Sequence, residues 1–164
     1  MVQQLSPLTC KRHYIPNPVT SVRKSITHIH NAIPWDDDKS AFYRAVVKEC
    51  AIRCMDIALL DDQNFSGDCE IHVKEMLGIS SPAFLDQLLE QETSSVPVEN
   101  GLVVYFEYTA RVFSYDVLHV GIVQGSKVRS RWGINGPLIL HDIFHVPVEY
   151  GDSLFYFGGW KDSS

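Results

Sequence analysis

The chain has 164 residues, of which 45% are hydrophobic and 21% are charged, and its formal net charge is −6. This composition excludes an intrinsically disordered chain, and the acidic balance argues against a nucleic-acid partner, which a basic surface would attract. The length predicts one domain, residues 1–164, that is large enough to bury its own core. No hydrophobic run approaches the length of a transmembrane helix, so we expect no membrane partner.

The cysteines and the first residues bear on the cellular compartment. The start of the chain lacks a basic segment followed by an apolar core, so no signal peptide is predicted. The spacing of the four cysteines is not that of a disulfide framework: Cys10, Cys50, Cys54 and Cys69. We therefore expect free thiols in a reducing compartment and a cytoplasmic protein.

The N-terminal part has a weak pattern. Residues 1–35 contain four prolines and no clear hydrophobic period, which predicts an irregular segment lying over the core. One short strand is expected near residues 26–29. Residues 36–95 are predicted to be the helical part of the domain. Its first and longest helix is expected from about 40 to 60, because apolar side chains recur there every three or four positions, and a loop over 61–67 follows. This stripe includes Cys50 and Cys54, which we expect to be small buried hydrophobic residues.

Two shorter helices are predicted after this one. Residues 68–77 are expected to form a helix that Gly78 ends, and residues 81–92 a helix with Ser81 as cap and Pro82 in its first turn. Residues 93–100 are expected to be a linker.

Residues 101–158 have the pattern of an antiparallel sheet. Aliphatic and aromatic strand formers gather in five short runs: 102–108, 116–123, 127–133, 138–140 and 153–157. Helices first and antiparallel strands second predict an α+β fold.

The central hairpin of this sheet presents a histidine. Leu118, Val120 and Ile122 are expected on one face and His119 on the other, because neighbours on a strand alternate. Gly121 is expected to leave open space beside the imidazole. A turn at residues 125–126 would place Ser130 and Trp132 on the same face as His119.

Cys69 is the cysteine predicted at a helix start. The helix dipole and free backbone N–H groups there favour a thiolate and can receive an oxyanion. A histidine on the sheet under that helix would supply a general base, so Cys69 and His119 form a coherent nucleophile–base pair. The alternative is a structural cysteine and an unrelated histidine.

The succession of helix, Gly67-Asp68-Cys69 at a helix start and the strand His119-Val120-Gly121-Ile122-Val123 resembles the NlpC-type cysteine amidases and endopeptidases. The resemblance covers about residues 40–157. It implies a papain-like fold, with N-terminal helices packed on a C-terminal antiparallel sheet, and cleavage of a peptide or amide bond. Cys69 carries over as nucleophile, His119 as base and Ser130 as the orienting group. Asp68 and Trp132 are expected to bind the substrate, a peptide or a small amide.

Other assignments remain open at this point. Glu70-Ile71 stand where the family has Ser-Gly, so an inactive binding or structural domain on the same fold is the alternative function. Cys50 is a rival nucleophile if Glu49-Cys50-Ala51 opens a helix.

The remaining histidines have weaker patterns. His141 and His145 could be two metal ligands, and Asp142 or Asp152 could complete the site. None of these offers a third ligand at convincing spacing, so no metal and no cofactor is expected. His141 is a candidate third catalytic residue, or the partner in a structural hydrogen bond. His28 and His30 are expected at the surface.

Overall fold

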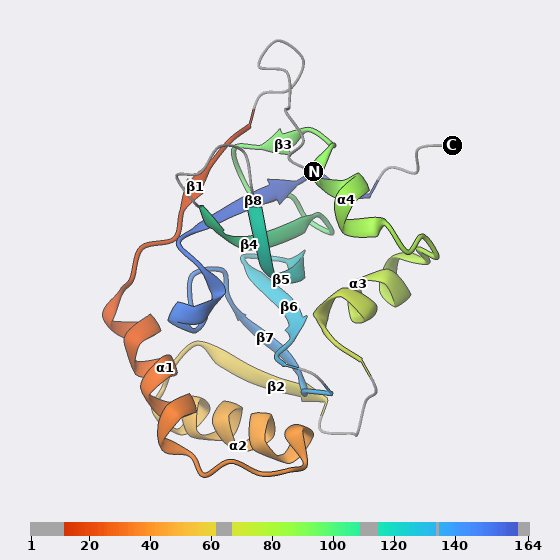
Figure 1. Ribbon diagram of the computed structural model, residues 1–164. Coiled ribbons are helices and arrows are strands. Elements are labelled where there is room, and N and C mark those ends of the chain that lie inside the picture. Colours follow the sequence, from red (N-terminus) through yellow and green to blue (C-terminus); the bar gives the residue numbers. More distant parts are fainter. Residues whose placement is uncertain (1–11, 62–66, 109–114, 134, 161–164) are drawn as a thin grey trace.

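The computed structural model describes residues 12–61, 67–108, 115–133 and 135–160, and Figure 1 shows their arrangement. They form a mixed α+β structure with an antiparallel sheet of eight strands, ordered β1-β8-β4-β5-β6-β7-β2, while β3 pairs with β8. The strands are β1 (Ile15–Pro16), β2 (Ile57–Asp61), β3 (Thr93–Ser94), β4 (Leu102–Tyr108), β5 (Tyr115–Gln124), β6 (Lys127–Arg131), β7 (Leu138–Asp142) and β8 (Ser153–Phe157). The helices are α1 (Ser21–Ala32), α2 (Lys39–Ile52), α3 (Cys69–Leu77), α4 (Phe84–Leu89) and the 3₁₀ turn η1 (Val148–Tyr150).

Hydrophobic residues are buried on both faces of this sheet. On one face, side chains of α1 and α2 pack with those of Val103, Tyr105 and Trp132. On the other, side chains of α3 and α4 pack with those of Val104 and Val120. Figure 1 shows α1 and α2 at the lower left of the sheet and α3 and α4 at its right. Since both faces are covered, β4 is buried at five consecutive positions and not at alternate ones.

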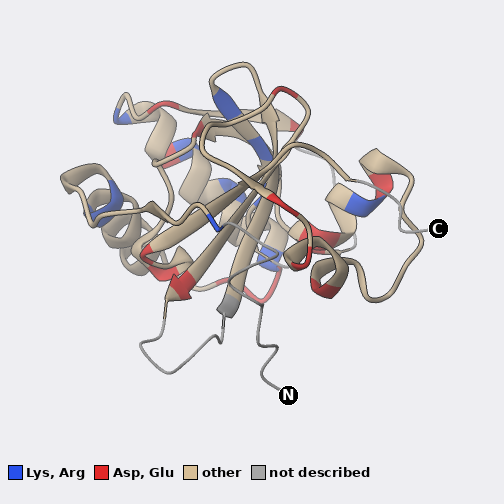
Figure 2. Cartoon of the chain, turned by 90° about the horizontal axis from the view of Figure 1, so that it is seen from above, with Lys and Arg blue, Asp and Glu red and all other residues tan. Residues whose placement is uncertain are grey.

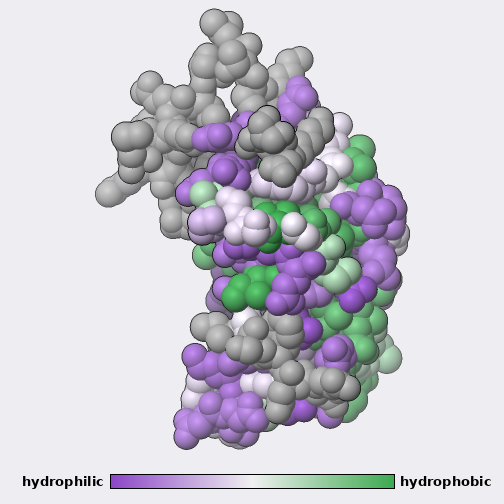
Figure 3. All heavy atoms as spheres, turned by 90° about the vertical axis from the view of Figure 1, so that its right-hand side faces the viewer, coloured by the Kyte–Doolittle hydropathy of each residue, from purple (hydrophilic) through white to green (hydrophobic). Residues whose placement is uncertain are grey.

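The surface carries mixed charge. Figure 2 shows basic and acidic residues interspersed along the described elements. Figure 3 shows hydrophobic atoms reaching the surface among hydrophilic ones on the α3 and α4 side of the molecule. Ile71, Met76 and Leu118 are exposed hydrophobic residues of α3 and β5. Within the described residues, none of the helices has the length and apolar character needed to cross a bilayer.

The prediction of an irregular segment over residues 1–35 is wrong for its described part. Residues 21–32 form α1 and not a strand near 26–29, and the Thr20 side chain caps this helix by accepting from the Arg23 amide. Ile26 and Ile29 lie on the same helix face and are fully buried in the core. The polar residues between them obscured this period, and the tertiary packing of the two isoleucines stabilises the helix.

The long helix predicted from 40 to 60 is correct only in its first part. The α2 helix begins after the Asp38 cap and ends at Ile52, and Cys54 follows in a left-handed conformation with φ of 60°. The chain then enters β2, which pairs with β7. Cys50 is buried as predicted, but Cys54 is exposed, because it lies in the turn beyond the helix.

The prediction for α3 is confirmed, and that for the next helix is partly wrong. The Asp68 side chain caps α3 by accepting from the Ile71 amide, and Gly78 ends it with φ of 68°. The α4 helix is shorter than predicted, because it begins at Phe84 and its N-cap side chain makes no hydrogen bond. The predicted linker includes β3.

The antiparallel arrangement of the C-terminal sheet is confirmed. Gln124 pairs with Lys127 across the predicted turn, where Gly125 has φ of 65°. β7 runs on to Asp142, so His141 lies in a strand and not in a loop. The edge strands β1, β2 and β3 come from the part of the chain that precedes residue 101.

Candidate functional site

Cys69 and His119 line the same cavity, which has a volume of about 260 Å³. Cys69 is the first residue of α3, and His119 lies in the middle of β5. The other lining residues come from α2, the cap of α3, β5, the segment after β6 and η1: Tyr43, Asp68, Leu118, Gly133 and Tyr150. Five separate parts of the chain therefore line this cavity.

A division in the sheet explains how these two residues can line one cavity. The α3 helix packs on the Val120 face, whereas His119 points to the opposite face, because neighbours on a strand alternate. The last residue pair between β5 and β6 is Ile122 and Arg129. Beyond this pair, β5 remains paired with β4, and β6 remains paired with β7. Leu118 and His119 both line the cavity, so it is reached from both faces at this division.

The Cys69 thiol lies at the capped start of α3. Cys69 is half-buried. The backbone N–H of Ile71 already donates to the Asp68 side chain, which caps the helix. Burial raises the pKa of the Cys69 thiol to about 11, while a hydrogen bond from the Val120 backbone amide opposes this rise. The sulfur is thus held beside the residue that follows His119, and it is a neutral thiol at pH 7.

The imidazole of His119 is held by aromatic rings. It is 2% exposed and stacks on Tyr150, with ring centroids 4.4 Å apart and planes inclined by 20°. The ring of Tyr105 lies 5.5 Å away. The buried Nε2 atom of His119 has no hydrogen-bond partner. Burial, followed by the influence of His141, lowers the pKa of His119 well below its ordinary value, so the ring is neutral at pH 7.

Two expectations about the surroundings of His119 are wrong. Gly121 leaves no open space, because a Cβ atom built on it would lie 2.3 Å from Cγ1 of Val128. Ser130 does not orient His119: its hydroxyl lies 2.9 Å from Nε2 of His141. The strand alternation placed Ser130 on the correct face, but β7 supplies a nearer imidazole.

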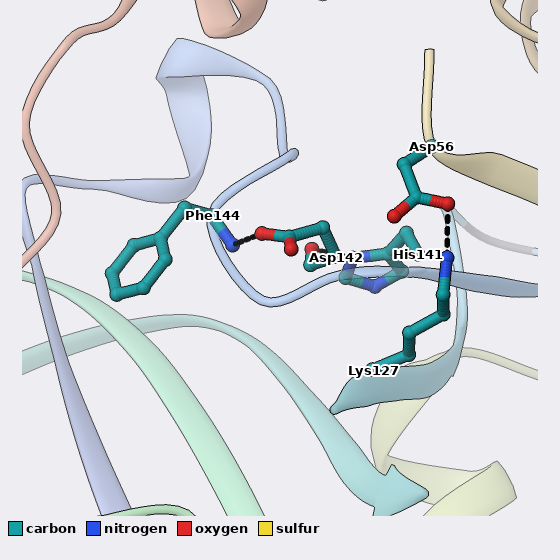
Figure 4. Close-up of polar contacts among 5 residues, drawn as sticks. All are labelled: Asp56, Lys127, His141, Asp142 and Phe144. Atoms are coloured by element: carbon teal, nitrogen blue, oxygen red, sulfur yellow. Dashed lines mark hydrogen bonds and ion pairs between the residues drawn. The ribbon is translucent and has the colours of Figure 1, made fainter. Parts of the chain in front are cut away.

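His141 has a structural hydrogen-bond network. Its Nδ1 atom lies 2.8 Å from the carbonyl oxygen of Asp142, which can only accept, so Nδ1 carries the proton and Nε2 accepts from Ser130. Figure 4 shows this histidine near the Asp56–Lys127 ion pair and the Asp142 carboxylate, which accepts from the Phe144 amide at 2.9 Å. The His141 ring centroid is 6.4 Å from that of His119. Both ring nitrogens of His141 are therefore occupied.

The two predicted substrate-binding residues lie apart. Asp68 lines the cavity of Cys69 and His119. Trp132 is 1% exposed and lines a neighbouring cavity of about 230 Å³, so its expected place beside His119 is corrected. The rival nucleophile Cys50 lies within the core against α1 and the sheet, and burial raises its pKa to about 11.

The other histidines were considered above as metal ligands. Among the described residues, no group of three or more histidines, cysteines or acidic residues is placed to hold a metal ion. His28 is exposed, as expected. His30 is half-buried, with its ring 5.1 Å from Phe42 and 5.9 Å from Tyr43.

The sequence patterns did not single out Tyr43, Gly133 or Tyr150. Gly133 has φ of 77°, and a Cβ atom there would lie 2.1 Å from the Tyr43 ring, so only glycine fits at this wall. Burial raises the pKa of Tyr43, and burial, reinforced by Cys69, raises that of Tyr150 far more, so both hydroxyls stay protonated. Each hydroxyl therefore remains a potential hydrogen-bond donor, and both tyrosines line the cavity. In the sequence, the turn Tyr150-Gly151-Asp152 before the last strand was the signal that could have pointed to Tyr150.

Comparison of the chain with protein-family models, with curated proteins and with solved structures finds no match.

Proposed function

We propose that the protein is a papain-like cysteine hydrolase of the NlpC type that cleaves an amide or peptide bond. The observation that supports the proposal is the shared cavity, which Cys69 at the start of α3 and His119 on β5 both line. A nucleophile and a base that converge from separate elements on one pocket are the minimum that acyl transfer needs.

The proposed reaction uses two neutral partners. The Cys69 sulfur attacks the substrate carbonyl while its proton passes to His119, which then protonates the departing amine. Water next attacks the thioester while His119 accepts its proton. The C–S bond then breaks, His119 returns the proton to the Cys69 sulfur, and the acid leaves. Backbone N–H groups at the start of α3 and the Tyr43 or Tyr150 hydroxyl would donate to the oxyanion. Because both groups are neutral at rest, the proton must move during the attack and not before it.

A second candidate is a binding domain on the same fold without catalysis. Two observations favour it: Nε2 of His119 has no orienting partner, and burial shifts the pKa of each group toward its neutral form. In this case the cavity would hold a ligand, and Cys69 would be an ordinary buried thiol. The free thiols of Cys50, Cys54 and Cys69 suit the reducing cytoplasm that we propose for either function.

Acylation by p-nitrophenyl acetate at pH 7.5 distinguishes the two candidates. For a hydrolase, mass spectrometry should find the acetyl group on Cys69 before the exposed Cys54. The His119→Gln variant should slow acylation of Cys69 by about 100-fold or more, since general bases contribute roughly 10²–10⁴. Cys54→Ser is the matched control and should leave Cys69 unaffected.

The binding domain predicts the opposite order. A thiol with a pKa near 11 carries little thiolate at pH 7.5, so Cys54 would react first and His119→Gln would change nothing. The rate at Cys69 would also rise about tenfold per pH unit toward pH 11, because only the thiolate reacts. That outcome, with the thermal unfolding of His119→Gln close to wild type, would exclude the hydrolase.

A further inference from the structure

A second cavity adjoins that of Cys69. It has a volume of about 230 Å³ and shares two walls, Tyr43 and Tyr150, with the cavity that contains the cysteine and the histidine. Its other lining residues come from α1, the segment after β6 and the segment around η1: His30, Trp132, Pro147 and Glu149. The two cavities thus lie on either side of the same pair of tyrosines.

The tyrosine between the two cavities is close to both. The Tyr150 ring centroid is 4.4 Å from that of His119 and 6.0 Å from that of Trp132. On the other shared wall, Tyr43 lies 5.9 Å from His30. Because Tyr43 and Tyr150 line both cavities, a substrate with its carbonyl at Cys69 would reach the second cavity along these shared walls.

Size indicates what each cavity can hold. Pockets that enclose a whole small-molecule ligand have volumes of roughly 300 to 1,000 Å³. Each of these cavities is smaller, so each is suited to one part of a ligand. An amide group in the first and one side chain in the second would use both.

The lining selects the chemistry of that side chain. Trp132 meets Tyr150 edge to face, with planes inclined by 79°, and Pro147 adds a further apolar surface. Aromatic rings favour another ring in edge or offset contact. Glu149 is the carboxylate among the lining residues, and its Oε2 accepts from the Thr27 hydroxyl at 3.0 Å. Its charge disfavours an anionic side chain.

We propose that the cavity between Tyr43, Trp132 and Tyr150 is a specificity subsite for an aromatic, non-anionic side chain of an amide substrate. The substrate class follows from the proposed hydrolase function, on which this inference rests. The residues that line the subsite set which amide is chosen, while Cys69 and His119 act on the carbonyl.

The test measures binding without turnover. The full chain with Cys69→Ala is titrated with N-acetyl-phenylalaninamide, N-acetyl-alaninamide and the α-amide of N-acetyl-aspartic acid, whose side-chain carboxylate is free, and NMR follows the indole N–H of Trp132. The phenylalanine probe should bind at least about tenfold tighter than the alanine probe, because burying a phenyl ring is worth a factor of that size or more. The aspartate probe should bind weakest.

Two matched variants locate the subsite. His30→Ala should weaken binding of the phenylalanine probe several-fold, whereas His28→Ala, an exposed histidine on the same helix, should not. Glu149→Gln should improve binding of the aspartate probe alone. Equal affinities for the three probes would overturn the subsite. Binding that leaves the NMR signal of the Trp132 indole N–H unshifted would overturn it as well.

The outcomes separate the subsite from the hydrolase. Selective binding of the phenylalanine probe without acylation of wild-type Cys69 would retain the subsite and overturn catalysis. Acylation of Cys69 by phenylalanine and alanine esters at equal rates would retain catalysis and overturn the subsite.

Discussion

At the scale of single residues, the candidate site depends on close contacts at glycines. Gly121 lies two residues from His119. Val128 of the neighbouring strand fills the space that a side chain at position 121 would occupy. The same principle applies at Gly133, which lies against Tyr43. These glycines let strands and rings approach closely, so the position of the imidazole depends on residues that have no side chain of their own.

Gly121→Ala should destabilise the protein by roughly 1–3 kcal/mol, because the new methyl group would lie 2.3 Å from Cγ1 of Val128. Val128→Ala removes the atom that it meets, so the double variant should be more stable than the sum of the two single changes implies. Urea unfolding of the four proteins gives the coupling free energy. If the two changes in the free energy of unfolding are strictly additive, the contact between position 121 and Val128 does not restrict the residue at position 121.

At the scale of elements, one arginine joins α1 to the segment that carries Tyr150. The buried guanidinium of Arg23 donates to the carbonyl oxygens of six residues at 2.6–3.2 Å: Asn17, Pro18, Val146, Pro147, Val148 and Gly151. Burial lowers the pKa of Arg23 from its usual value, and nearby acidic groups oppose this shift. Since Tyr150 lies between the bonded carbonyls, Arg23 sets the place of the ring against which His119 stacks.

Arg23→Met should destabilise the fold by roughly 3–5 kcal/mol, since it leaves several buried carbonyl groups without donors. Arg53→Met is the matched control, because Arg53 makes a partly exposed ion pair with Glu49 on α2 at 3.2 Å. That pair should be worth less than about 1 kcal/mol. Thermal or urea unfolding measures both, and equal losses in the two variants would contradict the role given to Arg23.

At the scale of the whole molecule, three buried histidines link folding to pH. Burial lowers the pKa of His72 to about 4, and burial lowers that of His141 to about 4 as well. Burial also lowers the pKa of His119. In the unfolded chain all three titrate near pH 6.5, so the unfolded state binds their protons first as the pH falls. The stabilising contribution of His72 and His141 is complete above about pH 6.5 and is lost as the pH falls through about 4. His119 contributes in the same direction, because its pKa is lowered too.

The free energy of unfolding should therefore fall between about pH 6.5 and 4, by roughly 1.4 kcal/mol per pH unit for each histidine. His72→Leu should remove one histidine's share of this slope and cost little at pH 7, because Nε2 of His72 has no partner to lose. His28→Gln on the surface should leave the curve unchanged. Parallel curves for wild type and His72→Leu would contradict the prediction.

Much of the fold was predictable from local chemistry. Asp68 and Gly78 mark the ends of α3, the alternation along β5 assigns His119 to its face, and the turn at Gly125 sets the strand register. These features act between neighbours in the chain, so they can be read from the sequence. The convergence of Cys69 and His119 was an inference from that pattern and from a family resemblance, and their catalytic roles stay predictions.

The errors came from contacts between distant parts of the chain. The α1 helix depends on packing of Ile26 and Ile29 against the sheet, and β2 depends on pairing with β7, some eighty residues later in the chain. Local patterns were sufficient to assign the α+β class, the capped helix that begins at Cys69 and the strand that carries His119. The bond from Ser130 to His141, the stacking of Tyr150 on His119 and the place of Trp132 in a second cavity required the folded chain. Those outcomes depend on which side chain is nearest in space, which no local pattern encodes.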